Sequence, residues 1–325
     1  MDQFHESMSE LNMTHFDRST LKLTKQIGGG YTGDVYEGTM KLLDNTIGVV
    51  VKRLSSDNYD PHSDYTVYSD ALDECKISSK FMDNPERLIQ FYGYSTQESS
   101  SKTRIYLLME KTNSEGDISK HIYKDIFWKR ITKEEYENNY KITMMYHGPK
   151  YWDYIMDRKD KLHLMYEMSL AIQELHSHNI VHSDLKPHNM LFTDGKVKLI
   201  DFNASHNMGS QKTIEGSCEP GTPGYMAKEM YNGTISYKAD IYSLGVCMLE
   251  VWFGDIWPSE SSKYSKCRKY VLDYLYMIGK QEPKLHTLIK KCVSSDVKSR
   301  PSIKKVVSNL KDILELPEIS QLYDN

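Results

Sequence analysis

The sequence His182-Ser183-Asp184-Leu185-Lys186-Pro187-His188-Asn189 decides the fold of this 325-residue chain. It sets an acid, a cation and an amide within six positions of one another. Seventeen residues after Asp184 comes a second short motif, Asp201-Phe202-Asn203. These two polar motifs are the first candidates for a functional site.

Regular elements flank both motifs. Apolar residues at helical spacing precede the first motif, from Met165 to Leu175. Between the motifs, Met190 to Phe192 and Val197 to Ile200 are apolar runs separated by Asp194-Gly195, which predicts a β-hairpin. The first third of the chain predicts several strands and one helix, over Asp70 to Phe81.

A glycine cluster lies near the start, in Gly28-Gly29-Gly30-Tyr31-Thr32-Gly33-Asp34-Val35. Glycines let the backbone approach phosphate oxygens and present N–H groups to them. Such a cluster is more often only a turn. A dinucleotide-binding reading would need a helix next, whereas Val35 to Glu37 predicts a strand, so the pattern favours a strand–loop–strand flap.

Lys52 ends the apolar run Val49-Val50-Val51, nineteen residues after Gly33. A lysine in this place is commonly an edge residue that reaches water. The functional alternative is a cation for phosphates, which requires an acidic partner. Glu74, on the predicted helix, is the candidate, although a lone Glu on a helix is normally solvated.

In combination these motifs resemble the eukaryotic protein kinase family. Later parts of the chain add to the resemblance, which runs in order over roughly residues 21–312: Gly221 to Glu229, Ser236 to Gly245 with Asp240, and Arg300-Pro301. The resemblance implies an α+β, bilobal kinase fold. The expected parts of the chain are a polar leader (1–18), a kinase domain (19–312) and a tail (313–325). Within the domain we expect a β-rich N-lobe with one main helix (about 19–111) and a larger, mostly helical C-lobe (about 112–312). The C-lobe is expected to carry an insert (about 119–160).

The resemblance also implies ATP and Mg²⁺ or Mn²⁺ as cofactors. Asp184 would orient the substrate hydroxyl and accept its proton, Lys186 would neutralise charge on the γ-phosphate, and Lys52, fixed by Glu74, would hold the α/β-phosphates. Asn189 and Asp201 would ligate the metal. The implied nucleotide-binding residues are Ile27, Gly28, Gly29, Gly30, Gly33, Val35, Lys52, Glu110, Thr112, Asp117 and Leu191. For Asp117, a ribose contact and a solvated helix start are equally open.

By the resemblance, two features imply serine/threonine specificity, and the activation-segment and late-lobe motifs imply protein substrates. Lys186 stands two residues after Asp184, and Gly221-Thr222 precedes Tyr225. Thr222 is expected to bridge Asp184 and Lys186.

A pseudokinase that serves as a nucleotide-binding scaffold is the alternative, and a kinase-fold enzyme for small molecules is a third. Substitutions motivate the pseudokinase: Ser78 replaces an apolar residue, Ser183 an arginine, Asn203 a glycine and Lys228 a proline. The retained charged and amide residues favour catalysis. Because Ser183 carries no charge, phosphorylation of Thr213 or Ser217 is not expected to be required, and Glu229 is expected to pair with Arg300.

The insert lengthens the segment between Asp117 and His182, which is about 28 residues longer than in a compact kinase. It holds nine aromatic residues among many charges. A helical elaboration packed on its own lobe is the preferred interpretation. A docking surface for a partner protein is the alternative.

The composition of the chain excludes several other classes of protein. Lys+Arg is 41 and Asp+Glu is 45, a formal net charge of −4, which argues against a nucleic-acid binder. Five scattered cysteines, without a CxxC pair, indicate a reducing compartment. The N-terminus lacks an apolar signal segment, and the run Ile47 to Val51 is too short to span a bilayer. We therefore expect a soluble intracellular protein without membrane partners, located in the cytoplasm, with the nucleus as the open alternative.

Overall fold

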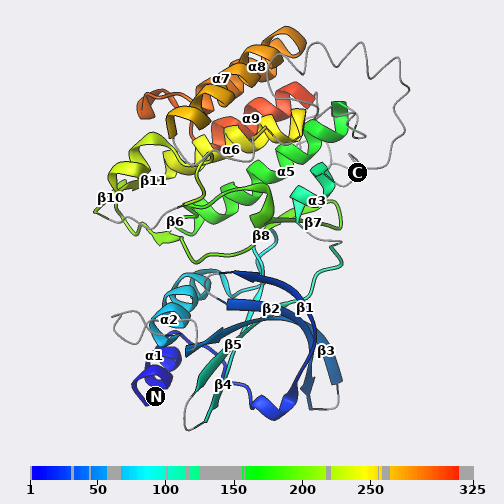
Figure 1. The fold of residues 1–325 in the computed structure, drawn as a ribbon, viewed down its shortest axis with the longest axis vertical. Helices are drawn as coiled ribbons and strands as arrows, with labels where there is room; N and C mark the ends of the chain where they lie inside the picture. The colour runs from blue at the N-terminus through cyan, green and yellow to red at the C-terminus, as the bar shows by residue number, and fades with distance from the viewer. Residues whose placement is uncertain are drawn as a thin grey trace, which may run out of the picture. The chain divides into compact units, whose positions relative to one another are not determined.

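The computed structural model describes residues 2–30, 33–43, 45–56, 67–99, 102–114, 117–123, 156, 158–216, 221–254, 256–257 and 264–314. The chain forms two compact units (Figure 1). The first contains Met1–Asn113 together with Ile200–Ser205, and the second contains Ser114–Leu199 and His206–Asn325. The proposed docking surface in the insert falls mostly on residues 124–155, which lie outside the described residues.

The N-terminal unit is built on a five-stranded antiparallel sheet of order β1-β2-β3-β5-β4. Its strands are β1 (Leu21–Gly30), β2 (Gly33–Leu42), β3 (Asn45–Ser55), β4 (Phe91–Glu98) and β5 (Thr103–Glu110). The strand predicted over Leu88 to Tyr94 begins later, at Phe91, and its pairing with β5 extends to Glu98.

Side-chain alternation sends the strands' apolar residues to both faces of this sheet. On β5, Ile105 and Leu107 join one buried cluster, whereas Tyr106 and Leu108 join the other. Helix α2 (Val67–Ser78), continued by a 3-10 turn at Ser79–Phe81, contributes its stripe Val67, Ala71 and Cys75 to the first cluster. The helix predicted over Asp70 to Phe81 is thus present and begins three residues earlier.

The N-terminal segment corrects the sequence interpretation. Residues 1–18 were expected to form a loose polar leader, but Asp2–Glu10 is a helix, α1, and its Phe4 and Met8 are buried in the first cluster. Asn12 ends the helix in the left-handed conformation (φ 56°), and the Met13 amide donates to the Met8 carbonyl. Two apolar residues four positions apart suffice to bury one stripe of an otherwise polar helix.

The C-terminal unit is mostly helical. Its elements are α3 (Ile118–Tyr123), α5 (Arg158–Ser177), β6 (Ile180–Val181), β7 (Met190–Thr193), β8 (Lys196–Leu199), β9 (His206–Asn207), β10 (Thr213–Glu215), β11 (Thr234–Ser236), α6 (Tyr237–Phe253), α7 (Tyr264–Gln281), α8 (Pro283–Cys292) and α9 (Ile303–Leu314). Helix α6 is buried along nearly its whole length and packs against α5, α7 and α8 (Figure 1). Helix α6 is therefore the central helix in the hydrophobic core of this unit.

The predicted hairpin is confirmed. Strands β7 and β8 pair in register from Met190↔Leu199 to Thr193↔Lys196. Asp194 and Gly195 both have positive φ (51° and 76°), as a two-residue type I′ turn requires. Among the helices that the structure describes, none combines the length and the apolar character needed to cross a membrane.

Candidate active site

The N-terminal unit contains a buried ion pair. Lys52 Nζ on β3 lies 2.9 Å from Glu74 Oε2 on α2, and both side chains are buried. Burial by itself would lower the pKa of Lys52, but the negative charges of Glu74 and Asp201 outweigh it, and the net pKa lies above its ordinary value. Lys52 is therefore a permanent cation, and the predicted pairing with Glu74 is confirmed.

Asp201 lies beside this pair. Its Oδ1 is 3.6 Å from Lys52 Nζ, and its side chain is 44% exposed. The Asn203 amide donates to the same oxygen at 2.6 Å. Asp201, not Asn203, has the left-handed backbone (φ 61°), so the asparagine that replaces the usual glycine is not required to adopt positive φ.

An aromatic contact anchors the same motif. The rings of Phe81 and Phe202 lie 4.9 Å apart at 57°, and both residues are buried. Ser78, where the kinase pattern has an apolar side chain, is also buried at the end of α2. Phe81, three residues further on, supplies an apolar contact to Phe202.

The glycine motif forms the end of the β1–β2 hairpin, as the strand–loop–strand interpretation predicted. Gly28 pairs with Val35, and Gly30 pairs with Gly33. A Cβ on Gly33 would lie 2.5 Å from the Arg53 carbonyl oxygen, so this position accepts only glycine without a shift of β3. Ile27, Gly29 and Gly30 complete the described part of the hairpin.

The predicted base-binding segment follows β5. The Glu110 amide donates to the Gln90 carbonyl at 2.9 Å, and the Glu110 carboxylate accepts from the Gln90 amide at 2.7 Å. The Glu110 amide is thus committed within its own unit. Thr112 is half-buried two residues further on.

Asp117 and Leu191 belong to the C-terminal unit, where they form an isolated antiparallel bridge. Asp117 directly precedes α3, and the Ser119 hydroxyl donates to its carboxylate. Asp117 thus lies at the start of a helix, and its carboxylate accepts a hydrogen bond from within the same turn.

The loop between β6 and β7 concentrates the polar groups of the C-terminal unit around Asp184. Lys186 Nζ donates to Asp184 Oδ2 and to Thr222 Oγ1, both at 2.7 Å. The hydroxyl and the amide of Thr222 donate to Asp184 Oδ1, also at 2.7 Å. The predicted bridge of Thr222 between Asp184 and Lys186 is therefore confirmed.

Asn189 completes this group. Its amide nitrogen donates to the Asp184 carbonyl at 2.8 Å and to Asp184 Oδ2 at 3.2 Å. Burial raises the pKa of Asp184, but hydrogen bonds and charge from Lys186, with help from Thr222 and His182, bring the net pKa below its ordinary value. Asp184 is consequently an anion at neutral pH.

A buried aspartate on α6 holds the backbone of this loop. Asp240 accepts from the amides of His182 (2.9 Å) and Ser183 (3.0 Å) and lies 2.8 Å from His176 Nε2. Ser183 has φ 65°, an uncommon conformation for a non-glycine residue, and its amide hydrogen bond compensates for it. The Ser183 hydroxyl lies 3.2 Å from His206 Nδ1 on β9.

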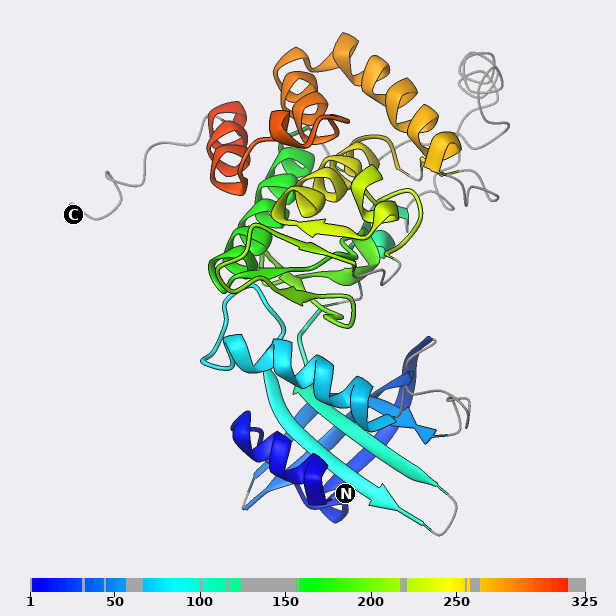
Figure 2. The same ribbon diagram turned by 90° about the vertical axis from the view of Figure 1, so that its left-hand side faces the viewer.

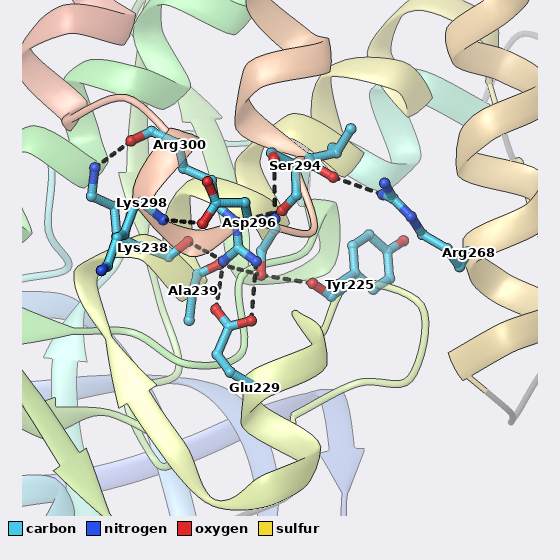
Figure 3. Close-up of polar contacts among 11 residues, drawn as sticks. Tyr225, Glu229, Lys238, Ala239, Arg268, Ser294, Asp296, Lys298 and Arg300 are labelled. Carbon is cyan, nitrogen blue, oxygen red and sulfur yellow. Dashed lines mark hydrogen bonds and ion pairs between the residues drawn. The ribbon is translucent and has the colours of Figure 1, made fainter.

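The segment after the second motif is held by a ladder and an ion pair. Thr213 to Glu215 pair with Thr234 to Ser236, and the Thr234 hydroxyl donates to Glu215 at 2.7 Å. The Arg300 guanidinium is 1% exposed and binds both oxygens of Glu229, at 2.5 and 3.0 Å (Figure 3). Arg300 also donates to the carbonyls of Lys238 and Ser294. The predicted Glu229–Arg300 pair is confirmed.

Sequence reasoning assigned no role to His176, His206 or Phe81. His206 follows Asp201 by five residues in a short polar run, and no pattern distinguishes it from a solvated residue. Among the described residues, no three His, Cys, Asp or Glu side chains are grouped to hold a metal ion.

The fold and these two groups of residues define a kinase-type domain. Residues 21–310 match the protein kinase domain family, and the chain belongs to that family. It is 35% identical over 144 residues to the putative serine/threonine-protein kinase R436 of Acanthamoeba polyphaga mimivirus, covering 43% of this chain and 52% of that protein.

Other similar proteins match over different spans. The SNF1-like protein kinase ssp2 of Schizosaccharomyces pombe is 28% identical over 179 residues, 51% of this chain and 30% of that protein. The L-type lectin-domain containing receptor kinase IX.2 of Arabidopsis thaliana is 27% identical over 322 residues, 91% of this chain and 42% of that protein. The chain thus spans about half, or less, of the length of these relatives.

Proposed function

We propose that this protein is a serine/threonine protein kinase that transfers the γ-phosphate of ATP to hydroxyl groups of protein substrates. The observation that carries the proposal is the network in which Lys186 and Thr222 both bind Asp184. It puts an ionised carboxylate beside a lysine ammonium group, which is the pair of groups that phosphoryl transfer to a hydroxyl needs. The names of the mimivirus and other similar kinases agree with this class.

In this proposal Asp184 accepts a hydrogen bond from the substrate hydroxyl and then its proton. Its lowered pKa keeps it ionised and able to orient the nucleophile. Lys186 neutralises charge that develops on the transferred phosphoryl group. Thr222 holds both side chains, so the preference for Ser/Thr substrates rests on the same network.

The N-terminal unit would bind the nucleotide. Lys52, fixed by Glu74, pairs with the α/β-phosphates, and Gly28, Gly29, Gly30 and Gly33 bring backbone close to them. The half-buried Val35 and the 43%-exposed Ile27 offer apolar contact to the base. Because the Glu110 amide is committed to Gln90, we assign base recognition to the Glu110 carbonyl and to Thr112. In the C-terminal unit, Leu191 contributes apolar contact and Asp117 remains a candidate for the ribose.

A protein kinase domain uses ATP with a divalent metal ion, and the donor set here fits one. Asp201 offers a partly exposed carboxylate. The Asn189 nitrogen is bound to Asp184, so its amide oxygen is the atom suited to a hard cation. Mg²⁺ or Mn²⁺ held by these residues would neutralise phosphate charge.

The departures from the kinase pattern leave these groups in place. Ser78 is compensated by Phe81, Asn203 donates to Asp201, and Ser183 is supported by Asp240. No observation on the described residues specifically favours a scaffold without activity. A kinase with an unusual activation segment is therefore the function that the geometry supports best.

The test is transfer of radiolabelled phosphate from ATP to a generic protein substrate, with Asp184→Asn as the control. We expect phosphoserine and phosphothreonine, and a loss of about 10³-fold or more in the variant, as for removal of a preorganised catalytic group. Incorporation into tyrosine alone would contradict the specificity. Equal incorporation by both proteins would contradict the assignment of Asp184.

A further inference from the structure

Helix α1 packs against α2, the helix that carries Glu74 (Figure 2). The Phe4 ring lies 5.1 Å from the Tyr68 ring on α2 and 5.6 Å from the Tyr94 ring on β4. Phe4 thus connects the first turn of α2 with the sheet. Met8, fully buried, belongs to the same apolar cluster.

The end of the segment is fastened to β4. The Tyr94 amide donates to the Thr14 carbonyl and the Phe16 amide donates to the Tyr94 carbonyl, at 2.9 and 2.8 Å. A Cβ on Gly93 would lie 2.1 Å from the Thr14 carbonyl oxygen, so the sheet leaves room for this backbone only because residue 93 is glycine. The His5 ring and the Tyr94 hydroxyl are 2.7 Å apart. These contacts hold the segment at both ends of α1.

The inward side chains of α2 give a reason for this arrangement. Val67, Ala71 and Cys75, the α2 residues buried in this cluster, are of small to medium size, and the larger Tyr68 and Leu72 of the same helix are only partly buried against it. Phe4 and Met8 supply large apolar side chains to that cluster. Glu74 is next to Cys75, and its buried carboxylate lies 2.9 Å from Lys52. A displaced α2 would leave Glu74 buried without this partner and would leave Lys52 with only the more distant Asp201, at 3.6 Å.

We propose that Phe4 and Met8 are positioning residues for phosphoryl transfer, and that α1 holds α2 where Glu74 pairs with Lys52. The expected effect of α1 on the rate of phosphoryl transfer rests on the proposed function. It assigns an activating role to the segment before the kinase domain. A chain in which α1 is displaced would keep its catalytic loop but lose the Lys52–Glu74 pair.

Met8→Ala and Met40→Ala form a matched pair for the test. Both methionines are buried in the N-terminal unit, 0% and 1% exposed. Met8 lies in the cluster that includes α2, whereas Met40 lies in the cluster on the other face, whose members come from β1, β2, β3 and β5. Both deletions leave a similar cavity, so general destabilisation should be comparable.

Two quantities are measured in the full chain, at a temperature at which circular dichroism shows both variants folded. These are kcat for a protein substrate and the rate of acylation of Lys52 by an amine-reactive ester, followed by mass spectrometry. In Met8→Ala we expect kcat to fall about tenfold and Lys52 acylation to rise by a similar factor, because a misplaced catalytic group costs at least that much. Met40→Ala should stay close to the wild type, and Met8→Leu should restore both quantities.

If Met8→Ala does not fold, Phe4→Leu replaces it, because leucine keeps apolar bulk and removes the ring contacts with Tyr68 and Tyr94. Equal kcat and equal Lys52 acylation in the α1 variant and Met40→Ala would overturn the inference. A wild-type protein that transfers no phosphate would instead refute the proposed function. The Lys52 acylation rates would then still decide whether α1 positions α2.

Discussion

The Phe81 ring packs on the Phe202 ring at 4.9 Å, directly beside the aspartate proposed to bind metal. Phe81 follows α2 on a 3-10 turn, so this contact joins the end of the helix to the Asp201 motif. We expect Phe81→Ala to destabilise the protein by about 3–5 kcal/mol, as for other buried aromatic truncations. Phe81→Leu should cost less. Urea denaturation measures the difference, and a Phe81→Ala protein as stable as the wild type would contradict it.

Lys52→Met tests the phosphate site. We expect transfer to fall by about two to three orders of magnitude or more, because a preorganised charge is removed from the reacting centre. Methionine suits the buried position, but Glu74 loses its partner, so the variant should also be less stable and is assayed where circular dichroism shows it folded. Lys76→Met is the matched control, because Lys76 is an exposed lysine on α2 that pairs with Asp73. Parent-level transfer by Lys52→Met would show that the phosphates are bound elsewhere.

The two proposed metal ligands, Asp201 and Asn189, should differ in how their loss changes the dependence of activity on metal concentration. Activity should require Mg²⁺ or Mn²⁺, and Asp201→Ala should abolish it. Asn189→Ala should lose less at high metal concentration, because water can replace a neutral ligand in part. High metal concentration should restore the activity of Asn189→Ala only in part, because the Asn189 amide also donates a hydrogen bond to Asp184. A magnesium titration of each variant measures this, and undiminished activity in excess chelator would refute metal use.

The activation segment should not depend on a phosphate. Thr213 lies in the β10–β11 ladder, and Ser217 lies outside the described residues. Glu229→Ala should cost more activity than Thr213→Ala and Ser217→Ala combined, because breaking a buried pair such as Glu229–Arg300 costs about 3–5 kcal/mol. Each variant is assayed after phosphatase treatment, with mass spectrometry to confirm that phosphate is absent. Silencing by phosphatase, with rescue by Thr213→Glu, would contradict this prediction.

The contact of the N-terminal segment with β4 should be sensitive to acid. Burial and the neighbouring His5 lower the pKa of His15 below its ordinary value of 6.5, although Asp17 opposes them. Tyr94 and Thr96 also face the ring. The unfolded chain therefore binds this proton more tightly, and stability should fall as the pH drops below about 6.5. Urea melts between pH 7.5 and pH 5 should show this slope, and His15→Gln should reduce it.

Much of the site follows from local sequence. Asp194-Gly195 between two apolar runs determines the hairpin, because both positions tolerate positive φ. The spacing of Asp184, Lys186 and Asn189 along one short loop keeps them close in space. Their observed geometry also depends on Asp240 and Thr222, which are distant in the sequence. Ion pairs between distant residues, such as Lys52–Glu74 and Glu229–Arg300, followed only from the resemblance to kinases, since no local pattern joins them.

Tertiary structure alone decided the features that depend on surfaces far apart in the chain. Helix α1 is polar enough to suggest a loose leader, and it is folded because Phe4 and Met8 meet a cluster formed by α2, β3, β4 and β5. Phe81 compensates for Ser78 only because the turn after α2 reaches Phe202. Sequence patterns report which stripe of an element is apolar, whereas burial depends on whether another surface covers that stripe, and this is set by the packing of the whole unit.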